Sequence, residues 1–443
     1  MRLFYLYLWI VFQYSFRLYF KKIIIRNKSR FAFGRTIFVS NHQGSFMDPL
    51  LIASMRKPIV YFMVRSDVFN RYTERIFWSA HMLPIYRQRD GIDTIEKNQA
   101  IFEKTDRLLA RRRNILIFGE GFTDDRIQRR LHPIKKGPAR IGFSALEADG
   151  WKHPIYLQGL GINYADFNVR NSEVLVDAGK QICLNDFQEA YRQNPAKTIA
   201  DVTRMLDEDM RTLIPDVKDP EWSDFHEDIM MVTRKGIHPH SYNPKEPFEK
   251  RWLYALRLAQ WIDDQNQASL DELQGIRSNI ASYKQELVRL GIHEEDRYRV
   301  EHHSSRMWQI FVKLMVLFPV AIVGFLHAGL WIYLIKRWVE KSFKRLVYWG
   351  STKMVLAIFI VPLVNLPWCF ILPRILPWEP AWNWGITVLY FLSIGIFANI
   401  YLHFLDSLIT WIRWDKTRRK NLIKVNEMNL ILRTAIKEKI PVL

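Results

Sequence analysis

Short apolar runs alternate with longer helical patterns over the first half of the chain. Five runs have the length and composition of buried strands, and they span residues 36–40, 59–64, 114–118, 154–159 and 173–176. Helical patterns lie between them, notably from Asp93 to Arg113. Strands that alternate with helices are typical of a sheet covered by helices. We therefore predict an α/β domain over residues 31–215, with a mixed sheet flanked by helices.

Residues 216–300 are charged and rich in helix formers. Two stretches, Pro247–Gln265 and Ser269–Leu290, have the pattern of an antiparallel helix pair, and Pro247 suits the first turn of its helix. We find no residue pattern for chemistry in this helical hairpin region, so we expect it to serve packing or regulation.

Both ends of the chain carry apolar segments that indicate a membrane. Residues 1–30 begin with an aromatic-rich apolar stretch that runs into Arg17, Lys21 and Lys22 without a small-residue cleavage site. We predict a retained helix that lies in the membrane interface, with a short spanning helix as the alternative. Near the other end, apolar runs cover residues 308–335, 354–372 and 386–405, and about 20 apolar residues cross a bilayer. These runs predict a C-terminal α-helical membrane domain over residues 301–413, followed by a basic cytoplasmic tail over residues 414–443.

Charge predicts the side of the membrane on which each connection lies. The cations that follow the first apolar run are Lys336, Arg337, Lys341, Lys344 and Arg345, and five more fall between residues 413 and 420. Because positive charge stays cytoplasmic, we expect the first connection, the tail and the α/β domain on that side. Three simple spans cannot give this arrangement. We therefore predict that the first run is a re-entrant hairpin, broken near Pro319 and Gly324, and that two spans follow it.

Composition narrows the class of protein. The formal net charge is +19, and hydrophobic residues make up 49% and aromatic residues 14% of the 443 positions. Such charge suits nucleic acid, or an anionic membrane with phosphorylated substrates, unless it serves solubility alone. The apolar runs favour the membrane, so we expect an anionic membrane as partner and no nucleic acid. The two cysteines, Cys183 and Cys369, form no metal pattern, and we expect no metal site.

A polar segment, residues 41–49, directly follows the first predicted strand. It places His42 and Asp48 where a strand meets a helix. A buried carboxylate that accepts a hydrogen bond from one imidazole nitrogen fixes the tautomer and raises the basicity of the other nitrogen. The free nitrogen can then take a proton from an alcohol that attacks a thioester. A helix-capping aspartate beside an unrelated surface histidine is an equally good interpretation of this segment alone.

Three further segments add candidate binding residues. Arg87 and Arg89 share one short loop, and two arginines suit bidentate capture of phosphate unless the loop is simply exposed and basic. Glu120 ends a strand beside Gly121, which lets a ligand approach the backbone closely. The carboxylate either binds a glycerol hydroxyl or holds an arginine. Lys136 adds positive charge near the same edge.

Together these segments resemble the glycerolipid acyltransferase family, which includes glycerol-3-phosphate and 1-acylglycerol-3-phosphate acyltransferases. The resemblance covers about residues 30–185 and rests on four blocks in the family's order: Asn41 to Asp48, Pro84 to Arg87, Phe118 to Gly121, and Pro154-Ile155. It implies transfer of a fatty-acyl group to a glycerol-phosphate lipid precursor at the membrane. The donor is acyl-CoA or acyl carrier protein, a co-substrate, and no other cofactor is implied.

The family pattern also implies roles for individual residues. His42 is the general base, Asp48 orients it, and no covalent acyl-enzyme is formed. The pattern also implies that Arg87 binds the acceptor phosphate and that Glu120 and Gly121 shape its glycerol site. Apart from the family pattern, the loop arginine Arg89 and the nearby Lys136 complete the predicted substrate-binding residues. His132 lies between two of these segments, and we interpret it as a surface residue.

The sequence departs from the family pattern at two places. Five residues separate His42 from Asp48 where the usual number is four, a spacing found in some branches with C-terminal membrane segments. The longer spacer requires a bulge at Gly44-Ser45 to restore the contact. In the third block, Gly119 and Phe122 replace the usual Pro and Thr, which bears on the identity of the acceptor more than on the reaction.

Two other functions compete with acyl transfer to glycerol-3-phosphate or its 1-acyl derivative. The first keeps the chemistry but uses another lysolipid as acceptor, such as an amino-acid-containing one. The second is a non-enzymatic membrane scaffold that binds anionic lipid through its charge, which leaves the polar residues at the strand ends without a purpose. A hydrolase is less compatible with the sequence, because the Gly-x-Ser-x-Gly nucleophile elbow is absent.

Overall fold

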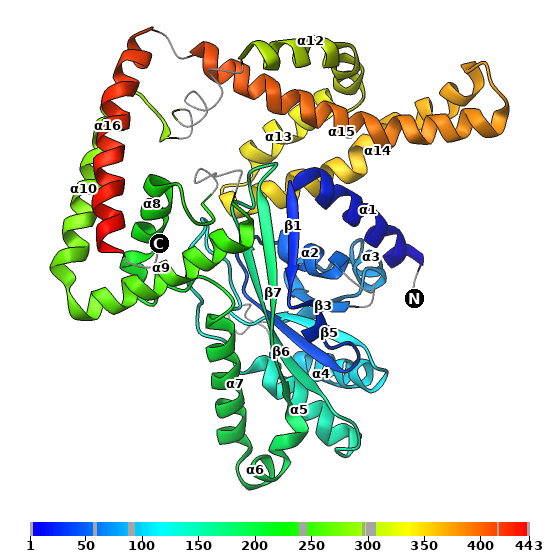
Figure 1. The fold of residues 1–443 in the computed structure, drawn as a ribbon. Coiled ribbons are helices and arrows are strands. Elements are labelled where there is room, and N and C mark those ends of the chain that lie inside the picture. The colour runs from blue at the N-terminus through cyan, green and yellow to red at the C-terminus, as the bar shows by residue number, and fades with distance from the viewer. Residues whose placement is uncertain are drawn as a thin grey trace. The chain divides into compact units, whose positions relative to one another are not determined.

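The computed structural model describes residues 3–55, 60–86, 94–238, 246–294, 297, 307–413 and 416–440. The chain divides into two compact units, drawn together in Figure 1. The first unit comprises Met1–Ser223 and Phe248–Asp263, and the second comprises Asp224–Pro247 and Asp264–Leu443.

A seven-stranded mixed sheet forms the centre of the first unit, in the order β1-β7-β6-β2-β5-β3-β4. All neighbouring strands are parallel except β6 and β7, which run antiparallel. The strands are β1 (Lys22–Arg26), β2 (Thr36–Ser40), β3 (Val60–Arg65), β4 (Met82–Ile85), β5 (Asn114–Phe118), β6 (Tyr156–Tyr164) and β7 (Glu173–Cys183). The predicted mixed sheet flanked by helices is therefore confirmed.

Helices cover both faces of this sheet (Figure 1). On one face, α4, α5 and α7 pack with alternate residues of β2, Ile37 and Val39, in a single apolar core. On the other face, Phe38 of β2 meets Ile52 and Met55 of α2, and α1 packs against α2. The side chains alternate because successive residues of a strand point to opposite faces. The helices are α1 (Leu3–Tyr19), α2 (Met47–Met55), α3 (Glu74–Ser79), α4 (Thr94–Ala110), α5 (Gly137–Asp149), α6 (Gln188–Gln193), α7 (Pro195–Arg211) and α9 (Phe248–Ala268).

Two strands of the sheet were not predicted. Strand β1 pairs with β7 and extends the sheet beyond the region of strand-helix alternation. Strand β4 contains Leu83, which is fully buried, in a segment that the sequence presents as part of a loop. Both strands lie at the edges of the sheet. Strand β4 has only four residues, and β1, although as long as β2, has three isoleucines between a lysine and an arginine.

Helix α1 packs against the rest of the first unit along one side. The hydroxyl of Tyr5 accepts a hydrogen bond from the backbone N–H of Val60 at 3.3 Å, and the Gln13 amide donates to the backbone carbonyl of Ser54. Other apolar side chains of α1 are exposed: Leu3, Tyr7 and Ile10. A helix that is apolar on its exposed side suits the predicted position in a membrane interface.

Helix α9 packs against the sheet at the edge formed by β1 and its neighbour β7. The buried Arg251 forms an ion pair with Glu173 at the start of β7, and the Arg26 guanidinium of β1 stacks on the Trp252 ring at 4.6 Å. This helix, as far as Asp263, belongs to the first unit, whereas α10 (Leu270–Arg289) belongs to the second.

The second unit is helical throughout its described elements. These are α8 (Ser223–Thr233), α10, α12 (Met307–Gly324), the π-helical segment η7 (Phe325–Gly329), α13 (Leu330–Ser342), α14 (Trp349–Ile375), α15 (Pro380–Arg413) and α16 (Lys416–Lys439). Helices α10 and α16 are antiparallel neighbours, joined by ion pairs of Glu286 with Lys424 and of Glu272 with Lys439. The residues predicted as a basic tail thus form a helix that packs against α10.

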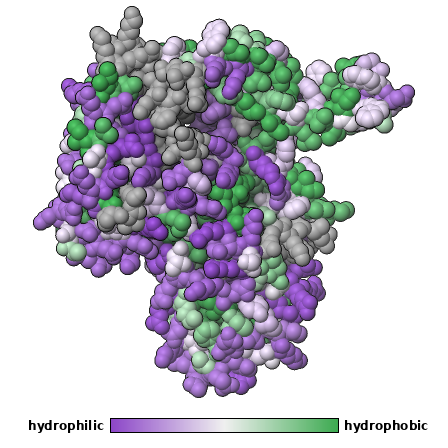
Figure 2. Space-filling model, in the orientation of Figure 1, coloured by the Kyte–Doolittle hydropathy of each residue, from purple (hydrophilic) through white to green (hydrophobic). Residues whose placement is uncertain are grey.

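Three helical segments are long and apolar enough to cross a membrane: Met307–Ser342, Leu346–Ile375 and Pro380–Ile412. Their exposed surface is largely apolar, as Figure 2 shows over α14 and α15. Helix α12 packs along α15, and α13 packs along α14. These helices are consistent with an integral membrane protein.

The first of these segments changes its hydrogen bonding in the middle. The helix continues through Pro319, and the π-helical segment begins one residue after Gly324, near the predicted break. In this segment, His327 pairs with the Asn365 side chain of α14 at 2.5 Å, and the Asn365 amide donates to the His327 carbonyl at 2.8 Å. The re-entrant path stays a prediction.

Candidate active site

His42 and Asp48 lie in contact at the carboxyl end of β2. The Nδ1 atom of His42 is 2.9 Å from Oδ2 of Asp48. The Asp48 side chain is fully buried in the first turn of α2, whereas 20% of the His42 side chain is exposed. The carboxylate of Asp48 is therefore buried against the imidazole, and the histidine keeps access to solvent.

Asp48 accepts two further hydrogen bonds. The backbone N–H of Gly44 donates to Oδ2 at 2.9 Å, and the hydroxyl of Tyr164 donates to Oδ1 at 2.8 Å. Burial, followed by the negative charge of Asp48, raises the pKa of Tyr164 well above its usual range. Tyr164 therefore stays protonated and can only donate to the carboxylate. An Asp48 that accepts from His42 leaves Nδ1 protonated and Nε2 with its lone pair free.

The five-residue spacer forms a tight turn between β2 and α2. Ser45 has a φ of 53°, in the left-handed region, and the N–H of Met47 donates to the Gly44 carbonyl at 3.0 Å. A Cβ atom on Gly44 would lie 2.7 Å from Oδ1 of Asp48. The Asp48 carboxylate thus packs directly against the Gly44 backbone, where a side chain has no room. The left-handed Ser45 in this turn accommodates the extra residue of the longer spacer.

Neighbouring strands hold the turn in place. The Asn41 side chain donates to the Ile162 carbonyl of β6 at 3.0 Å and accepts from the Ile162 N–H at 2.7 Å. The His42 ring stacks on Phe118, the last residue of β5, with ring centroids 4.1 Å apart. The imidazole is therefore fixed both by its backbone and by an apolar surface beneath the ring.

Glu120 joins two segments of the site through its buried carboxylate. Oε1 accepts from the backbone N–H of His42 at 2.7 Å, and Oε2 accepts from that of His132 at 3.2 Å. Burial raises the pKa of Glu120 to about 7, although the two backbone hydrogen bonds act to lower it. These two hydrogen bonds tie the segment at His42 to the segment at His132, a connection that the sequence did not suggest.

His132 belongs to a second histidine–aspartate pair in the same region. Its Nε2 atom lies 2.7 Å from Oδ2 of Asp124, and its ring lies beside Phe122 with centroids 4.4 Å apart. The side chain is 14% exposed, so His132 lies beside the site and keeps a small exposed surface. Nothing in the sequence pattern marks this pair, because seven residues without regular structure separate the two partners. Tyr164 was missed for a similar reason, since it ends a strand outside the four blocks.

Lys135 lies beside Gly121, at the turn that follows β5. The N–H of Lys135 donates to the Gly119 carbonyl at 3.0 Å. Its Nζ atom lies 2.7 Å from the place where a Cβ of Gly121 would be, and Gly121 has a φ of 75°. Gly121 therefore provides both a left-handed turn and the space that the lysine side chain occupies. The predicted Lys136 is exposed at the start of α5.

The predicted phosphate-binding residues Arg87 and Arg89 lie outside the described residues. Strand β4 precedes them and ends at Ile85. Strands β4, β3, β5 and β2 are parallel, so the carboxyl end of β4 lies on the same side of the sheet as those of β2 and β5. Among the residues that the structure does describe, no group of three or more His, Cys, Asp or Glu side chains could hold a metal ion.

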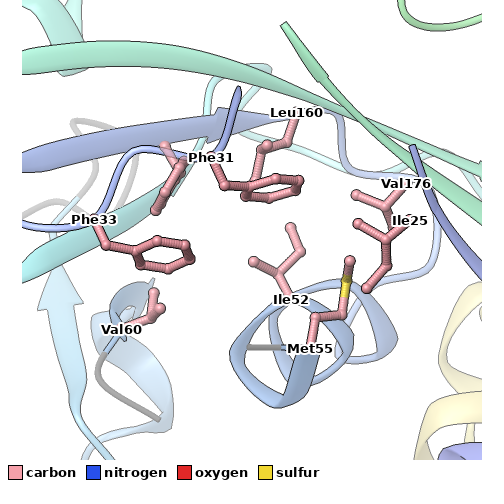
Figure 3. A pocket seen from close by; sticks show the side chains of 9 residues that line it. Ile25, Phe31, Phe33, Ile52, Met55, Val60, Leu160 and Val176 are labelled. Carbon is pink, nitrogen blue, oxygen red and sulfur yellow. The ribbon is translucent and has the colours of Figure 1, made fainter. Parts of the chain in front are cut away.

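A narrow apolar cavity lies under α2, on the same face of the sheet as Asp48. Figure 3 shows its lining side chains, which come from α2, the sheet and the segment before β2. They are Ile25, Phe31, Phe33, Phe38, Ile52, Met55, Val60, Leu160 and Val176. Ile52 follows Asp48 by four residues, about one helical turn. An apolar space thus begins one turn away from the histidine–aspartate pair.

Comparison with known proteins finds a family model that matches part of the chain. Residues 22–158 match the model of the family described as Acyltransferase. One solved structure with a likeness to the chain is the 1-acyl-sn-glycerophosphate (LPA) acyltransferase PlsC from Thermotoga maritima. It is 14% identical, the match covers 45% of this chain and 78% of that protein, and the TM-score is 0.32. No curated protein sequence matches the chain.

Proposed function

We propose that this chain, whose residues 22–158 match the Acyltransferase family model, transfers a fatty-acyl group from an acyl thioester to glycerol-3-phosphate or 1-acylglycerol-3-phosphate. The contact between His42 and Asp48 carries the proposal. The donor is acyl-CoA or acyl carrier protein, and the acceptor comes from the membrane. The charge pattern of the chain puts the active site at the cytoplasmic face.

The reaction uses the free Nε2 atom of His42 as general base. Nε2 takes the proton from the acceptor hydroxyl as its oxygen attacks the thioester carbonyl carbon, and a C–O bond forms. The tetrahedral intermediate then collapses with cleavage of the C–S bond. The thiolate leaves, and the proton on Nε2 returns to the sulfur. Asp48 keeps Nδ1 protonated throughout and stabilises the imidazolium that forms between the two steps.

Charge beside the site supports a phosphorylated acceptor. The ammonium group of Lys135 lies against the backbone of Gly121. Gly121 directly follows Glu120, whose carboxylate accepts from the His42 N–H. Within the described part of the chain, no carboxylate lies within ion-pairing distance of Lys135. An unpaired cation close to the base suits the phosphate of the acceptor. Arg87 and Arg89 are proposed to add to this charge.

The apolar cavity under α2 supports a fatty-acyl substrate. Its described lining is entirely apolar, and it begins one helical turn from the carboxylate that orients the base. When an acyl chain occupies this space, its thioester carbon lies near the turn between β2 and α2. The narrow cavity requires side chains such as Ile52 and Met55 to shift when the chain enters, because protein cores hold few empty spaces.

The same acyl transfer to another lysolipid is the second candidate, favoured by the Gly119 and Phe122 departures. A Cβ on Gly119 would lie 2.8 Å from side-chain atoms of both Ile134 and Val39, so this position has no room for a larger residue. Phe122 is 40% exposed beside His132. These two differences alter the acceptor side of the site and leave the His42–Asp48 pair intact.

The test is a transfer assay with the purified full-length protein and a radiolabelled acyl donor. Acyl-CoA and acyl carrier protein are each combined with glycerol-3-phosphate, 1-acylglycerol-3-phosphate and an amino-acid lysolipid. We expect transfer to a phosphorylated glycerol acceptor and its loss in His42→Ala. His153→Ala is the matched control, because His153 is an exposed histidine paired with Asp149 at 3.0 Å.

Three outcomes contradict parts of the proposal. Full activity in His42→Ala removes the mechanism. Transfer only to the amino-acid lysolipid favours the second candidate. A wild-type protein that binds anionic vesicles but transfers no acyl group, with any donor or acceptor, favours the scaffold.

A further inference from the structure

Helix α13 carries a groove that the transfer reaction does not use. Its lining residues are Leu334, Arg337, Trp338, Glu340 and Lys341. All five lie in the second half of α13, which is the last part of the candidate span Met307–Ser342. The groove therefore lies where an apolar segment ends, at the depth at which lipid headgroups meet water.

The groove contains two basic side chains that form no ion pair with a described carboxylate. Arg337 and Lys341 are four residues apart and lie on the same face of the helix. The acidic side chain in the groove, Glu340, forms an ion pair with Lys353 of α14 at 2.6 Å. Over the described ranges, neither Arg337 nor Lys341 has a carboxylate within ion-pairing distance. Two cations thus remain available for an anion.

Apolar side chains lie beside these charges. Leu334 is 47% exposed and Trp338 is 56% exposed. Along the helix axis, Leu334 comes first, and Trp338 lies between the two cations, Arg337 and Lys341. Tryptophan is enriched at headgroup depth because its ring is apolar and its N–H is polar. This order matches a phospholipid, whose apolar chains lie below a charged headgroup.

We propose that this groove binds an anionic phospholipid of the bilayer, with its phosphate between Arg337 and Lys341, beside Trp338, and its chains against Leu334. The occupant is a lipid rather than free phosphate, because the groove joins an apolar surface to the cations. It lies among the cations that follow the first apolar run, so the lipid belongs to the cytoplasmic leaflet.

Native mass spectrometry of the full-length protein in detergent tests the proposal. The protein is incubated with phosphatidylglycerol or with phosphatidylcholine, and the retained lipid is counted without any acyl donor present. We expect preferential retention of phosphatidylglycerol, weakened about tenfold or more in Arg337→Ala/Lys341→Ala, since each basic residue contributes about 1 kcal/mol near an anionic surface.

Two further variants separate the groove from general charge and from fold damage. Lys336→Ala/Lys344→Ala removes the same charge from exposed positions outside the groove, and it should retain phosphatidylglycerol. Arg337→Lys/Lys341→Arg keeps the charge and should also retain it. Equal retention of both lipids by the wild type overturns the proposal, as does equal loss in the two double-alanine variants. Displacement of the lipid by inorganic phosphate at equal concentration would indicate a soluble-anion site instead.

Discussion

The hydroxyl of Tyr164, at the end of β6, donates to Oδ1 of Asp48, in the first turn of α2, at 2.8 Å. This bond ties the carboxylate that orients His42 to the centre of the sheet. It leaves Oδ2 for His42 and for the Gly44 backbone. The position of the base therefore depends on a residue that does not touch the reacting atoms.

Tyr164→Phe should slow transfer without changing the binding of the acceptor. The substitution keeps the ring and removes one of three donors to a buried carboxylate, so Asp48 is held less firmly. We expect kcat to fall about 10- to 100-fold, as for other residues that orient a functional group, with KM for the acceptor unchanged. Tyr61→Phe, at a tyrosine that stacks on His81, is the control. A Tyr164→Phe enzyme with wild-type kcat would show that the phenol is only structural.

Gly44→Ala should disrupt the same carboxylate from the opposite side. The new methyl group would lie 2.7 Å from Oδ1 of Asp48 and 3.1 Å from the Tyr164 ring, and both sit in a packed interior that resists displacement. We expect kcat to fall by at least about tenfold, since small displacements of a catalytic group are costly. Gly137→Ala adds the same methyl group where no atom lies within 4 Å, and it should keep full activity. Equal activity of the two variants would contradict the described turn.

The central strands could be predicted because burial imposes a continuous apolar run. The β2 residues Thr36–Ser40 are buried throughout, and the predicted bounds match the observed ones. The edge strands β1 and β4 each pair with one neighbouring strand. Their assignment depends on this pairing, which cannot be recognised in the sequence.

The site divides in the same way between local and distant contacts. His42 and Asp48 are close in sequence and lie on one turn, so their contact could be predicted from their spacing. Tyr164 lies 116 residues after Asp48 in the sequence. The two backbone N–H groups that donate to the Glu120 carboxylate come from different segments. Such contacts depend on the strand order, which places β2 between β5 and β6. Lys135, rather than its predicted neighbour Lys136, lies beside Gly121 because consecutive residues point in different directions.

Glu120→Gln should change how stability depends on pH. Burial raises the pKa of Glu120 from its ordinary value of 4.5 to about 7 in the folded protein. The folded state therefore favours the protonated form, and this contribution is fully present below pH 4.5 and lost as pH rises through 7. Relative to Glu120→Gln, the wild type should lose up to about 3 kcal/mol of unfolding free energy across this window.

Chemical unfolding of both proteins in detergent, at several pH values from 4 to 8, measures this difference. Glu103→Gln, at an exposed glutamate of α4, is the control and should follow the wild type. A constant difference between wild type and Glu120→Gln at all pH values would mean that the carboxylate does not titrate in this range.

Lys135→Ala should weaken binding of the phosphorylated acceptor and leave the donor unaffected. The ammonium lies against Gly121, close to the turn that holds the base, and it has the position and charge to contact phosphate. Loss of one charge-assisted contact costs about 1.5–3 kcal/mol, so KM for the acceptor should rise at least about tenfold, with KM for acyl-CoA unchanged. Arg140→Ala removes an exposed cation from α5 and should leave both KM values as they are.

An acceptor analogue without phosphate should react equally poorly with wild type and Lys135→Ala. If Lys135→Ala raises KM for that analogue as well, the lysine supports the fold of the turn rather than the phosphate.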